Sequence, residues 1–185
     1  MIGAVLAGGA GTRLGAPSKP GMLLAGRPLV SYPVEALGAV CERVAIVCKR
    51  DTSLPPVDGA ERWDEPDWPR HPLTGIVFAL SRADEPVLVC AADMPFVTAD
   101  ACRSLLGAPQ KSVAVVAAAD GVLQPVFGIY APAALETLQA APPGAPLTRT
   151  VERLDPTRVA LPARVVRSVN TLEELAEAER LLAAV

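Results

Sequence analysis

The sequence is poor in the residues that several functional classes require. Aromatic residues make up only 4% of its 185 residues, and it contains a single histidine, His71. A His-based metal site or a Ser/Cys–His catalytic pair would therefore have to use His71. No basic stripe with interleaved aromatic residues is present, and the net charge is −3. These features argue against nucleic acid as a partner.

Long apolar segments are also missing. No apolar run approaches the roughly 20 residues of a membrane span, and the N-terminus lacks the regions typical of a signal peptide. The four cysteines, Cys41, Cys48, Cys90 and Cys102, form no C-x-x-C pair. This pattern favours small buried side chains in a reducing compartment. We therefore expect a cytoplasmic protein that does not bind membranes.

What the sequence does contain is a glycine-rich segment near its start. Ile2 to Leu6 is an apolar run long enough for one buried strand, and residues 7–11 (AGGAG) follow it. Arg13 and Lys19 come next, and no acidic residue precedes Glu35. Glycines let backbone N–H groups approach phosphate oxygens, and the two cations would neutralise the charge that remains. The segment predicts a polyphosphate-binding loop, and the alternative is a loose turn with two solvated cations.

The spacing of this segment matches neither of two common phosphate-binding motifs. No Gly-Lys-[Ser/Thr] follows at the P-loop spacing. In a G-x-G-x-x-G pattern that starts at Gly9, the third glycine would fall at Leu14, but the sequence has it at Gly15.

The order of predicted elements indicates an α/β protein. The first strand, a helix over about 29–40 and an apolar strand over 44–48 form a βαβ unit with a right-handed crossover. Further strands are expected near 61–64, 86–92, 112–118, 122–130, 159–161 and 164–169, and further helices end near 81 and 106 or cover 132–139 and 147–154. We predict one domain over residues 1–185, a three-layer α/β/α fold with a mostly parallel, Rossmann-like sheet.

Turn and cap signals add detail to this prediction. Pro28 fits the first turn of a helix, and Thr98 is expected to cap the helix that ends near 106. The strand 122–130 follows an Asp-Gly turn, which favours antiparallel pairing with its predecessor. The segment 171–174 (TLEE) matches a capping box. The last helix would place its apolar side chains inward, namely Leu172, Leu175, Ala176, Leu181 and Leu182.

Carboxylates stand near the ends of two predicted strands. Ligands of open α/β sheets collect at the carboxyl ends of strands, where the glycine-rich segment, Asp64 and Asp93 all fall. Nucleotide sites hold Mg²⁺ with one or two carboxylates and phosphate oxygens. Asp93 is the best candidate for that role, and the alternative is that it caps the next turn. Asp64, in a segment with several acids, fits a functional charge and a solvated charge equally well.

These features favour a transfer reaction without a protein nucleophile. Ser18 and Ser31 have no neighbouring base, so the sequence gives no support for covalent catalysis. A positively charged loop and a strand-end carboxylate suit phosphoryl or nucleotidyl transfer, which depends on positioning and charge neutralisation.

The sequence resembles a known family along nearly its whole length. The segment LAGGAGTRLGAPSKP, followed by AGRPL, is similar to the signature of the molybdenum-cofactor guanylyltransferase group of nucleotidyltransferases. Further blocks of that family recur in the same order: Asp64, HPLTGI (71–76), ADMP (92–95), QPVF (124–127) and VNTLEEL (169–175).

The resemblance implies a reaction and a nucleotide site. Members of this family join the GMP part of GTP to the terminal phosphate of molybdopterin and release pyrophosphate. Asp64 would then contact the nucleotide. The residues that would lie against the guanine and the nucleotide are Leu6, Ala7, Gly8 and Gly9.

The resemblance also implies catalytic residues and partners. Arg13 and Lys19 would hold the triphosphate and the departing pyrophosphate, and Asp93 would bind both the nucleotide and Mg²⁺. Asn170 would lie towards the pterin. The expected partners are GTP, the molybdopterin cofactor and proteins that deliver the cofactor.

Two positions depart from the family pattern. Many members carry an asparagine after the second strand, whereas this chain has VCKR at 47–50, and His71 stands where a glycine often precedes Pro-Leu. Alternative functions are a molybdopterin cytidylyltransferase, a phospholactate guanylyltransferase, a sugar-phosphate nucleotidyltransferase or a non-catalytic GTP-binding module.

Overall fold

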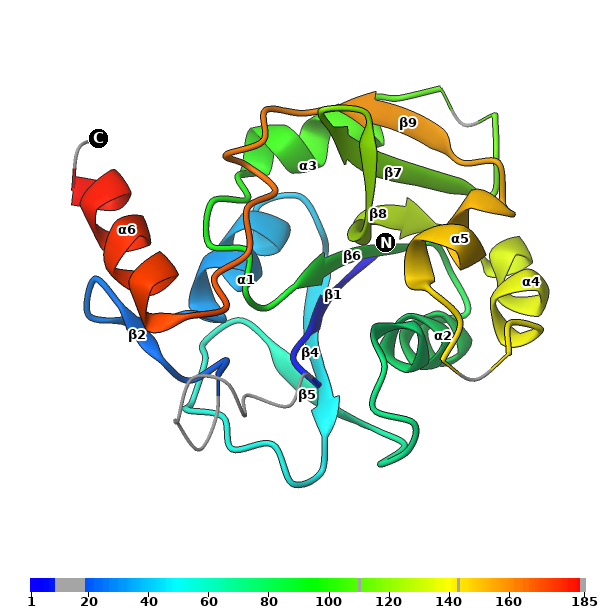
Figure 1. Cartoon of the computed structure of the whole chain (residues 1–185). Coiled ribbons are helices and arrows are strands. Elements are labelled where there is room, and N and C mark those ends of the chain that lie inside the picture. The colour runs from blue at the N-terminus through cyan, green and yellow to red at the C-terminus, as the bar shows by residue number, and fades with distance from the viewer. Residues whose placement is uncertain (9–18, 110, 143, 184–185) are drawn as a thin grey trace.

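A seven-stranded sheet forms the centre of the computed structural model, which describes residues 1–8, 19–109, 111–142 and 144–183 (Figure 1). In their order across the sheet, the strands are β5 (Glu61–Glu65), β4 (Arg43–Lys49), β1 (Ile2–Leu6), β6 (Val87–Ala91), β8 (Val122–Tyr130), β7 (Ala114–Ala119) and β9 (Thr157–Ala160).

Most neighbouring strands run parallel. β1 pairs with both β4 and β6, β4 pairs with β5, and β7 pairs with β9, all in parallel. β8 is antiparallel to both β6 and β7. The tight turn between β7 and β8 has positive φ at Asp120 (50°) and Gly121 (78°), as a two-residue hairpin requires. The predicted mostly parallel sheet and its antiparallel hairpin are confirmed.

Helices cover both faces of this sheet. α1 (Ser31–Gly38) and α3 (Ala99–Leu106) share one buried cluster with the strands. α2 (Pro72–Ala83), η1 (Pro132–Ala134), α4 (Leu135–Gln139) and α5 (Leu147–Glu152) share the cluster on the other face. The arrangement confirms the predicted three-layer α/β/α fold.

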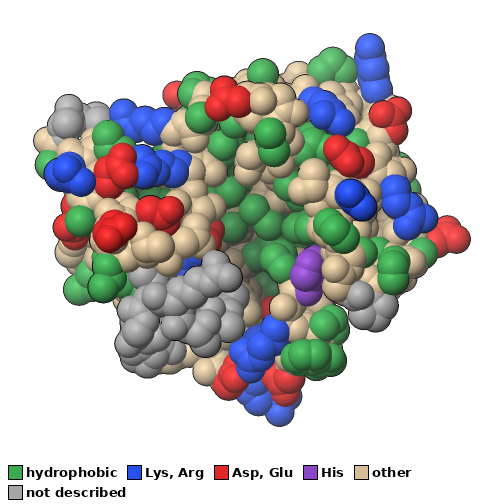
Figure 2. Space-filling view, viewed as in Figure 1, with side chains coloured by type: hydrophobic (Ala, Val, Ile, Leu, Met, Phe, Trp, Pro, Cys, Tyr) green, Lys and Arg blue, Asp and Glu red, His purple; other side chains and the backbone are tan. Residues whose placement is uncertain are grey.

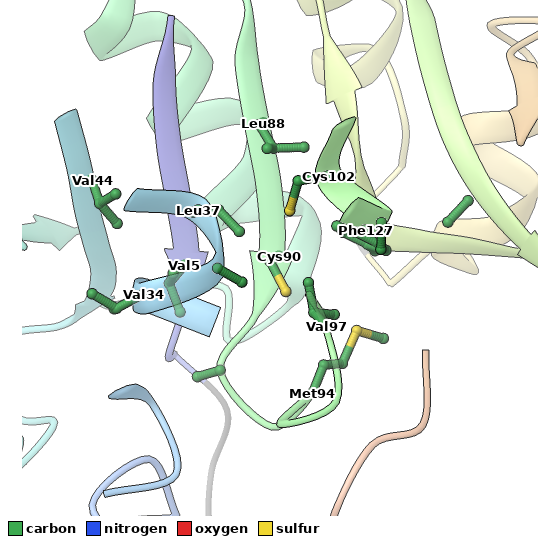
Figure 3. Packing of buried hydrophobic residues seen from close by; sticks show 14 of the residues in the cluster. Val5, Val34, Leu37, Val44, Leu88, Cys90, Met94, Val97, Cys102 and Phe127 are labelled. Carbon is green, nitrogen blue, oxygen red and sulfur yellow. The ribbon is translucent and has the colours of Figure 1, made fainter. Parts of the chain in front are cut away.

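The buried clusters consist of small and branched side chains, as the low aromatic content implies. Figure 3 shows Val5, Val44 and Cys90, from three adjacent strands, packed with Val34 and Leu37 of α1. Three of the four cysteines are buried, and all four are free. Burial raises the pKa of the Cys48 thiol to about 11, so this cysteine is a structural side chain rather than a reactive thiolate.

A small hairpin and the last helix form a third cluster beside the sheet. The hairpin strands are β2 (Leu23–Leu24) and β3 (Arg27–Pro28), and α6 (Leu172–Ala183) packs against them (Figure 1). Leu24, Leu29 and Phe96 meet Val169 and Ala178 there. The C-terminal segment is thereby held close to the residues that follow β1 and β6.

Three local predictions were wrong. The expected strand at 164–169 is a turn at 163–166 followed by a segment without regular secondary structure. Its buried side chains, Val166 and Val169, are three residues apart and do not alternate as those of a strand would. Pro28 lies in β3, and the helix begins later, at Ser31. Leu172 is 61% exposed and Ala176 is exposed as well, so the side of α6 that packs inward consists of Leu175, Ala178, Leu181 and Leu182.

The membrane prediction can be compared with the helices of the structure. Among the described residues, no helix is both long enough and apolar enough to span a bilayer.

The helix cap at Thr98 gives a test of the fold. Its hydroxyl accepts a hydrogen bond from the Ala101 N–H at 3.2 Å, as predicted from the sequence. Thr98→Ala should lower the free energy of unfolding by about 1 kcal/mol, because one backbone donor loses its partner. Urea denaturation measures this change. Ser104→Ala, an exposed change in the same helix, should stay within about 0.5 kcal/mol.

Candidate functional site

A cavity of about 270 Å³ opens at the carboxyl edge of the parallel strands. Figure 2 shows this face, with hydrophobic side chains inside the hollow and the histidine at its rim. The described residues that line it are Leu6, Ala7, Gly8, Lys19, Pro20, Leu29, Glu65, Arg70, His71, Pro72, Gly75, Ala91, Ala92, Asp93, Val126 and Ser168. The position agrees with the rule that open α/β sheets bind ligands at strand carboxyl ends.

Backbone hydrogen bonds extend the sheet pairing just beyond its strands. The Ala7 N–H donates to the Val47 carbonyl at 2.8 Å, and the Ala92 N–H donates to the Leu6 carbonyl at 2.9 Å. The residues after β1 and β6 therefore lie side by side. Asp93 follows directly, so a charged side chain is placed next to the segment 6–8.

Three predicted site residues meet at one point. The Lys19 Nζ donates to Asp93 Oδ2 at 2.5 Å and to Asn170 Oδ1 at 2.6 Å. The side chains of Lys19 and Asp93 are 15% and 23% exposed, so the ion pair is shielded but reachable from the cavity. The fold thus brings Lys19 together with two residues that lie 74 and 151 positions further along the sequence.

Local structure fixes Asn170 beside this ion pair. The Val169 N–H donates to the Asp93 carbonyl at 2.8 Å. Glu174 Oε2 accepts from the N–H groups of Asn170 (2.5 Å) and Thr171 (3.1 Å), and the Thr171 hydroxyl accepts from the Glu174 N–H at 3.1 Å. The predicted capping box is confirmed, and it holds the residue before the helix as well as the helix itself.

The side-chain oxygens at this point are suitable ligands for a magnesium ion that also binds phosphate. Asp93 offers a carboxylate, and Asn170 offers an amide oxygen 2.6 Å from the same ammonium group. The described residues contain no group of three or more His, Cys, Asp or Glu side chains that could hold a metal without help. Mg²⁺ is commonly bound by one or two carboxylates with the remaining ligands from phosphates and water.

The other predicted site residues lie elsewhere or outside the described residues. Asp64 is on the exposed side of β5, where its carboxylate accepts from Arg62 Nε at 2.8 Å, and it does not line the cavity. Its contact with the nucleotide stays a prediction. Gly9 and Arg13 fall outside the described residues. His71 lines the cavity and caps α2, because its Nδ1 accepts from the Leu73 N–H at 3.2 Å.

Sequence reasoning missed a buried ion pair at the cavity wall. Lys49 Nζ lies 3.4 Å from Glu65 Oε1, and both side chains are almost fully buried. The same Nζ donates to the carbonyls of Pro66 (2.5 Å) and Pro69 (3.0 Å). One signal was available, since Lys49 lies in the segment where the family carries an asparagine. A second was the period of two in β5, which places Trp63 and Glu65 on one face.

Two glycines leave room for the Glu65 carboxylate. A Cβ at Gly8 would lie 2.2 Å from Glu65 Oε1. A Cβ at Gly75 would lie 3.0 Å from Leu6 Cδ2 and 3.4 Å from Glu65 Oε2. The glycine at position 8 therefore serves the packing of an acidic side chain in addition to any role at a phosphate.

Burial raises the pKa of Glu65 above its ordinary value of 4.5, and the Lys49 ammonium acts in the opposite direction. Desolvation is the larger effect. The Lys49 ammonium therefore offsets part of the cost of burying the charged form of Glu65.

The chain matches the family profile described as the MobA-like NTP transferase domain over residues 3–159. The chain belongs to this family. A relative from Cereibacter sphaeroides, described as a molybdenum cofactor guanylyltransferase, is 31% identical over 189 residues, which cover 98% of this chain and 97% of that protein.

Solved structures support the fold of this family member. A crystal structure of molybdopterin-guanine dinucleotide biosynthesis protein A from Archaeoglobus fulgidus superposes with a TM-score of 0.78 over 100% of both chains, at 24% identity. A 2-C-methyl-D-erythritol 4-phosphate cytidylyltransferase from Thermus thermophilus superposes with a TM-score of 0.73 over 97% of this chain and 98% of that one, at 18% identity. The scaffold is therefore that of the NTP transferases.

Removing the cation of the buried pair tests its electrostatics. Lys49→Met should lower the free energy of unfolding by about 3–5 kcal/mol, because Glu65 is left buried without a partner charge. Urea denaturation near neutral pH measures the loss. The double variant Lys49→Met/Glu65→Leu should recover most of it, since a buried pair can be replaced by apolar side chains.

The same variant has a predictable pH dependence. The pKa of Glu65 is raised in the folded state, so the folded protein holds this proton more tightly than the unfolded chain. Stability of Lys49→Met should therefore fall as pH rises above about 4.5, and its deficit relative to wild type should shrink as pH is lowered towards that value. A deficit that does not change with pH would contradict this assignment.

Proposed function

We propose that the protein transfers GMP from GTP to the terminal phosphate of molybdenum-molybdopterin and releases pyrophosphate. Membership of the NTP transferase family and the full-length similarity to a molybdenum cofactor guanylyltransferase support this reaction. The main structural support for this reaction is that Lys19 is hydrogen-bonded to both Asp93 and Asn170 at the cavity edge. The four free cysteines agree with a reducing, cytoplasmic location, which is part of the proposal.

In this proposal the nucleotide lies across the carboxyl ends of β1 and β6. The segment Leu6 to Gly8 forms one wall of the cavity, and the backbone at Gly8 can be approached closely because no side chain projects from it. Gly9 and Arg13 extend the same segment and are proposed to contact the nucleotide and its triphosphate. Asp64 remains a proposed nucleotide contact.

Lys19 would stabilise the charge that develops on the departing pyrophosphate. Its ammonium group is held by two oxygen acceptors, Asp93 Oδ2 and Asn170 Oδ1, so its position is fixed before substrate arrives. Fixed charges of this kind act without the cost of reorganising solvent. A phosphate oxygen of the acceptor attacks the α-phosphorus of GTP, and the bond from that phosphorus to the pyrophosphate oxygen breaks.

A magnesium ion would be held by Asp93 together with phosphate oxygens. When bound, Mg²⁺ neutralises phosphate charge during the transfer. Asn170, hydrogen-bonded to Lys19 on the side of α6, would face the pterin substrate. Proteins that deliver the molybdopterin cofactor are proposed partners.

The substrate assignment is tested by the choice of nucleotide. The purified protein is incubated with Mg²⁺, the molybdopterin cofactor and each of GTP, CTP, ATP and UTP, and pyrophosphate is measured. Release with GTP alone is the expected result. Release with CTP and not with GTP would instead indicate the cytidylyl transfer considered from the sequence, and binding of GTP without release would indicate a non-catalytic GTP-binding module.

Asp93→Ala should reduce pyrophosphate release from GTP at least about 100-fold, because a ligand for the phosphate-bound metal is lost. Circular dichroism should show that the variant remains folded. Asp100→Ala is a matched control, since Asp100 lies on the exposed surface of α3, where it pairs with Arg103. Turnover by Asp93→Ala at the control rate would remove Asp93 from the metal site.

Lys19→Ala should weaken GTP binding and slow turnover, because the triphosphate loses a fixed positive charge. Isothermal titration and pyrophosphate release measure the two effects. Lys111→Ala removes an exposed lysine and should change neither. Unchanged GTP affinity in Lys19→Ala would contradict the proposed contact with phosphate.

A further inference from the structure

Glu65 presents an unused acceptor at the wall of the cavity. Its side chain is only 3% exposed, and it lines the cavity together with the segment after β1. Oε1 faces the Lys49 ammonium, whereas Oε2 is buried and has no hydrogen-bond partner within the described part of the chain. A buried carboxylate oxygen without a donor is costly, so a ligand donor that reaches Oε2 would remove that cost.

The cation of this pair does not supply that donor. Lys49 Nζ has three N–H groups, and it has three oxygen partners: the carbonyls of Pro66 and Pro69 and the carboxylate atom Glu65 Oε1. Its charge balances the carboxylate, but its hydrogen-bonding capacity is used. Lys49 is therefore a positioning residue, which holds Glu65 in a fixed orientation.

The surroundings of the carboxylate are kept small. Gly8 and Gly75 both approach it where a Cβ would collide with it or touch it, and Gly75 also packs against Leu6. Leu6, Gly8 and Gly75 line the same cavity as Glu65. The pocket next to the carboxylate is thus bounded by an apolar side chain and by backbone, which suits the flat face of a nucleobase.

We propose that Glu65 determines the choice of base, by accepting a hydrogen bond at Oε2 from the 2-amino group of guanine. A carboxylate oxygen only accepts hydrogen bonds, and Oε2 is the one that Lys49 leaves without a donor. Guanine presents its 2-amino group beside a second donor, N1–H, so no acceptor on that edge faces the carboxylate. Adenine and cytosine present a ring nitrogen acceptor beside their amino group, and that acceptor would face the carboxylate. This inference rests on the proposed transfer of GMP and assigns the recognition of its base.

The test compares GTP with ITP, because ITP lacks only the 2-amino group. Isothermal titration of the full chain with each nucleotide and Mg²⁺ gives two dissociation constants. Wild type should bind GTP about ten-fold more tightly than ITP or better, as expected for a hydrogen bond to a charged group. Glu65→Gln should bring the ratio close to one, because the Lys49 ammonium takes the single amide oxygen and the NH₂ group, a donor, is left in the place of Oε2.

Two further variants complete the design. Glu61→Gln, an exposed change on the same strand, should keep the wild-type ratio. Glu65→Asp keeps the charge opposite Lys49 but draws the carboxylate away from the cavity, and it should lower the ratio as well. If Glu65→Gln does not fold, the ratio of GTP to ITP affinity in Glu65→Asp tests the proposal instead.

Equal affinity of wild type for GTP and ITP would overturn the inference, and so would a wild-type ratio in folded Glu65→Gln or Glu65→Asp. The test does not depend on turnover. If the protein prefers GTP over ITP through Glu65 but releases no pyrophosphate with the molybdopterin cofactor, the base contact stands and the proposed reaction fails.

Discussion

The parallel pairing of β1 with both β4 and β6 is the constraint on which the site depends. It aligns the carboxyl ends of three strands, and the hydrogen bonds from Ala7 to Val47 and from Ala92 to Leu6 continue that alignment past the strands. Lys49 ends β4, and Asp93 comes two residues after β6. Asp93 in the cavity wall and Lys49, the partner of the wall residue Glu65, are therefore both placed by backbone pairing.

Two ion pairs with different physical properties contribute side chains to the cavity: Glu65 from one pair, and Lys19 and Asp93 from the other. The Lys49–Glu65 pair is almost fully buried, and carbonyl groups complete the coordination of its cation, so breaking it would leave a charge in a medium of low polarity. The Lys19–Asp93 pair is partly exposed, and the two partners of Lys19 Nζ among the described residues are oxygens that phosphate could replace. The first pair is suited to a fixed structural task, and the second to exchange with substrate.

Most of the fold could be predicted from the sequence alone, because the signals that locate strands and helix starts lie within short segments. Apolar runs located the strands, and Thr98 and the segment 171–174 located two helix starts. Lys19, Asp93 and Asn170 were selected separately from the sequence, and the fold brings them together. The strand expected at 164–169 failed because burial there follows tertiary contacts with two clusters, which no local pattern reports.

The position of Glu65 shows why the remaining part of the site could not be predicted. Asp64 and Glu65 are adjacent acids in an acid-rich segment. They differ in the face of β5 from which each side chain projects. The pairing of β4 with β5 turns Glu65 towards the cavity and Asp64 towards solvent. Its partner Lys49 lies opposite it in that pairing, 16 residues earlier in the chain. A strand shifted by one residue would exchange the two acids, so the identity of the buried acid is a property of register rather than of composition.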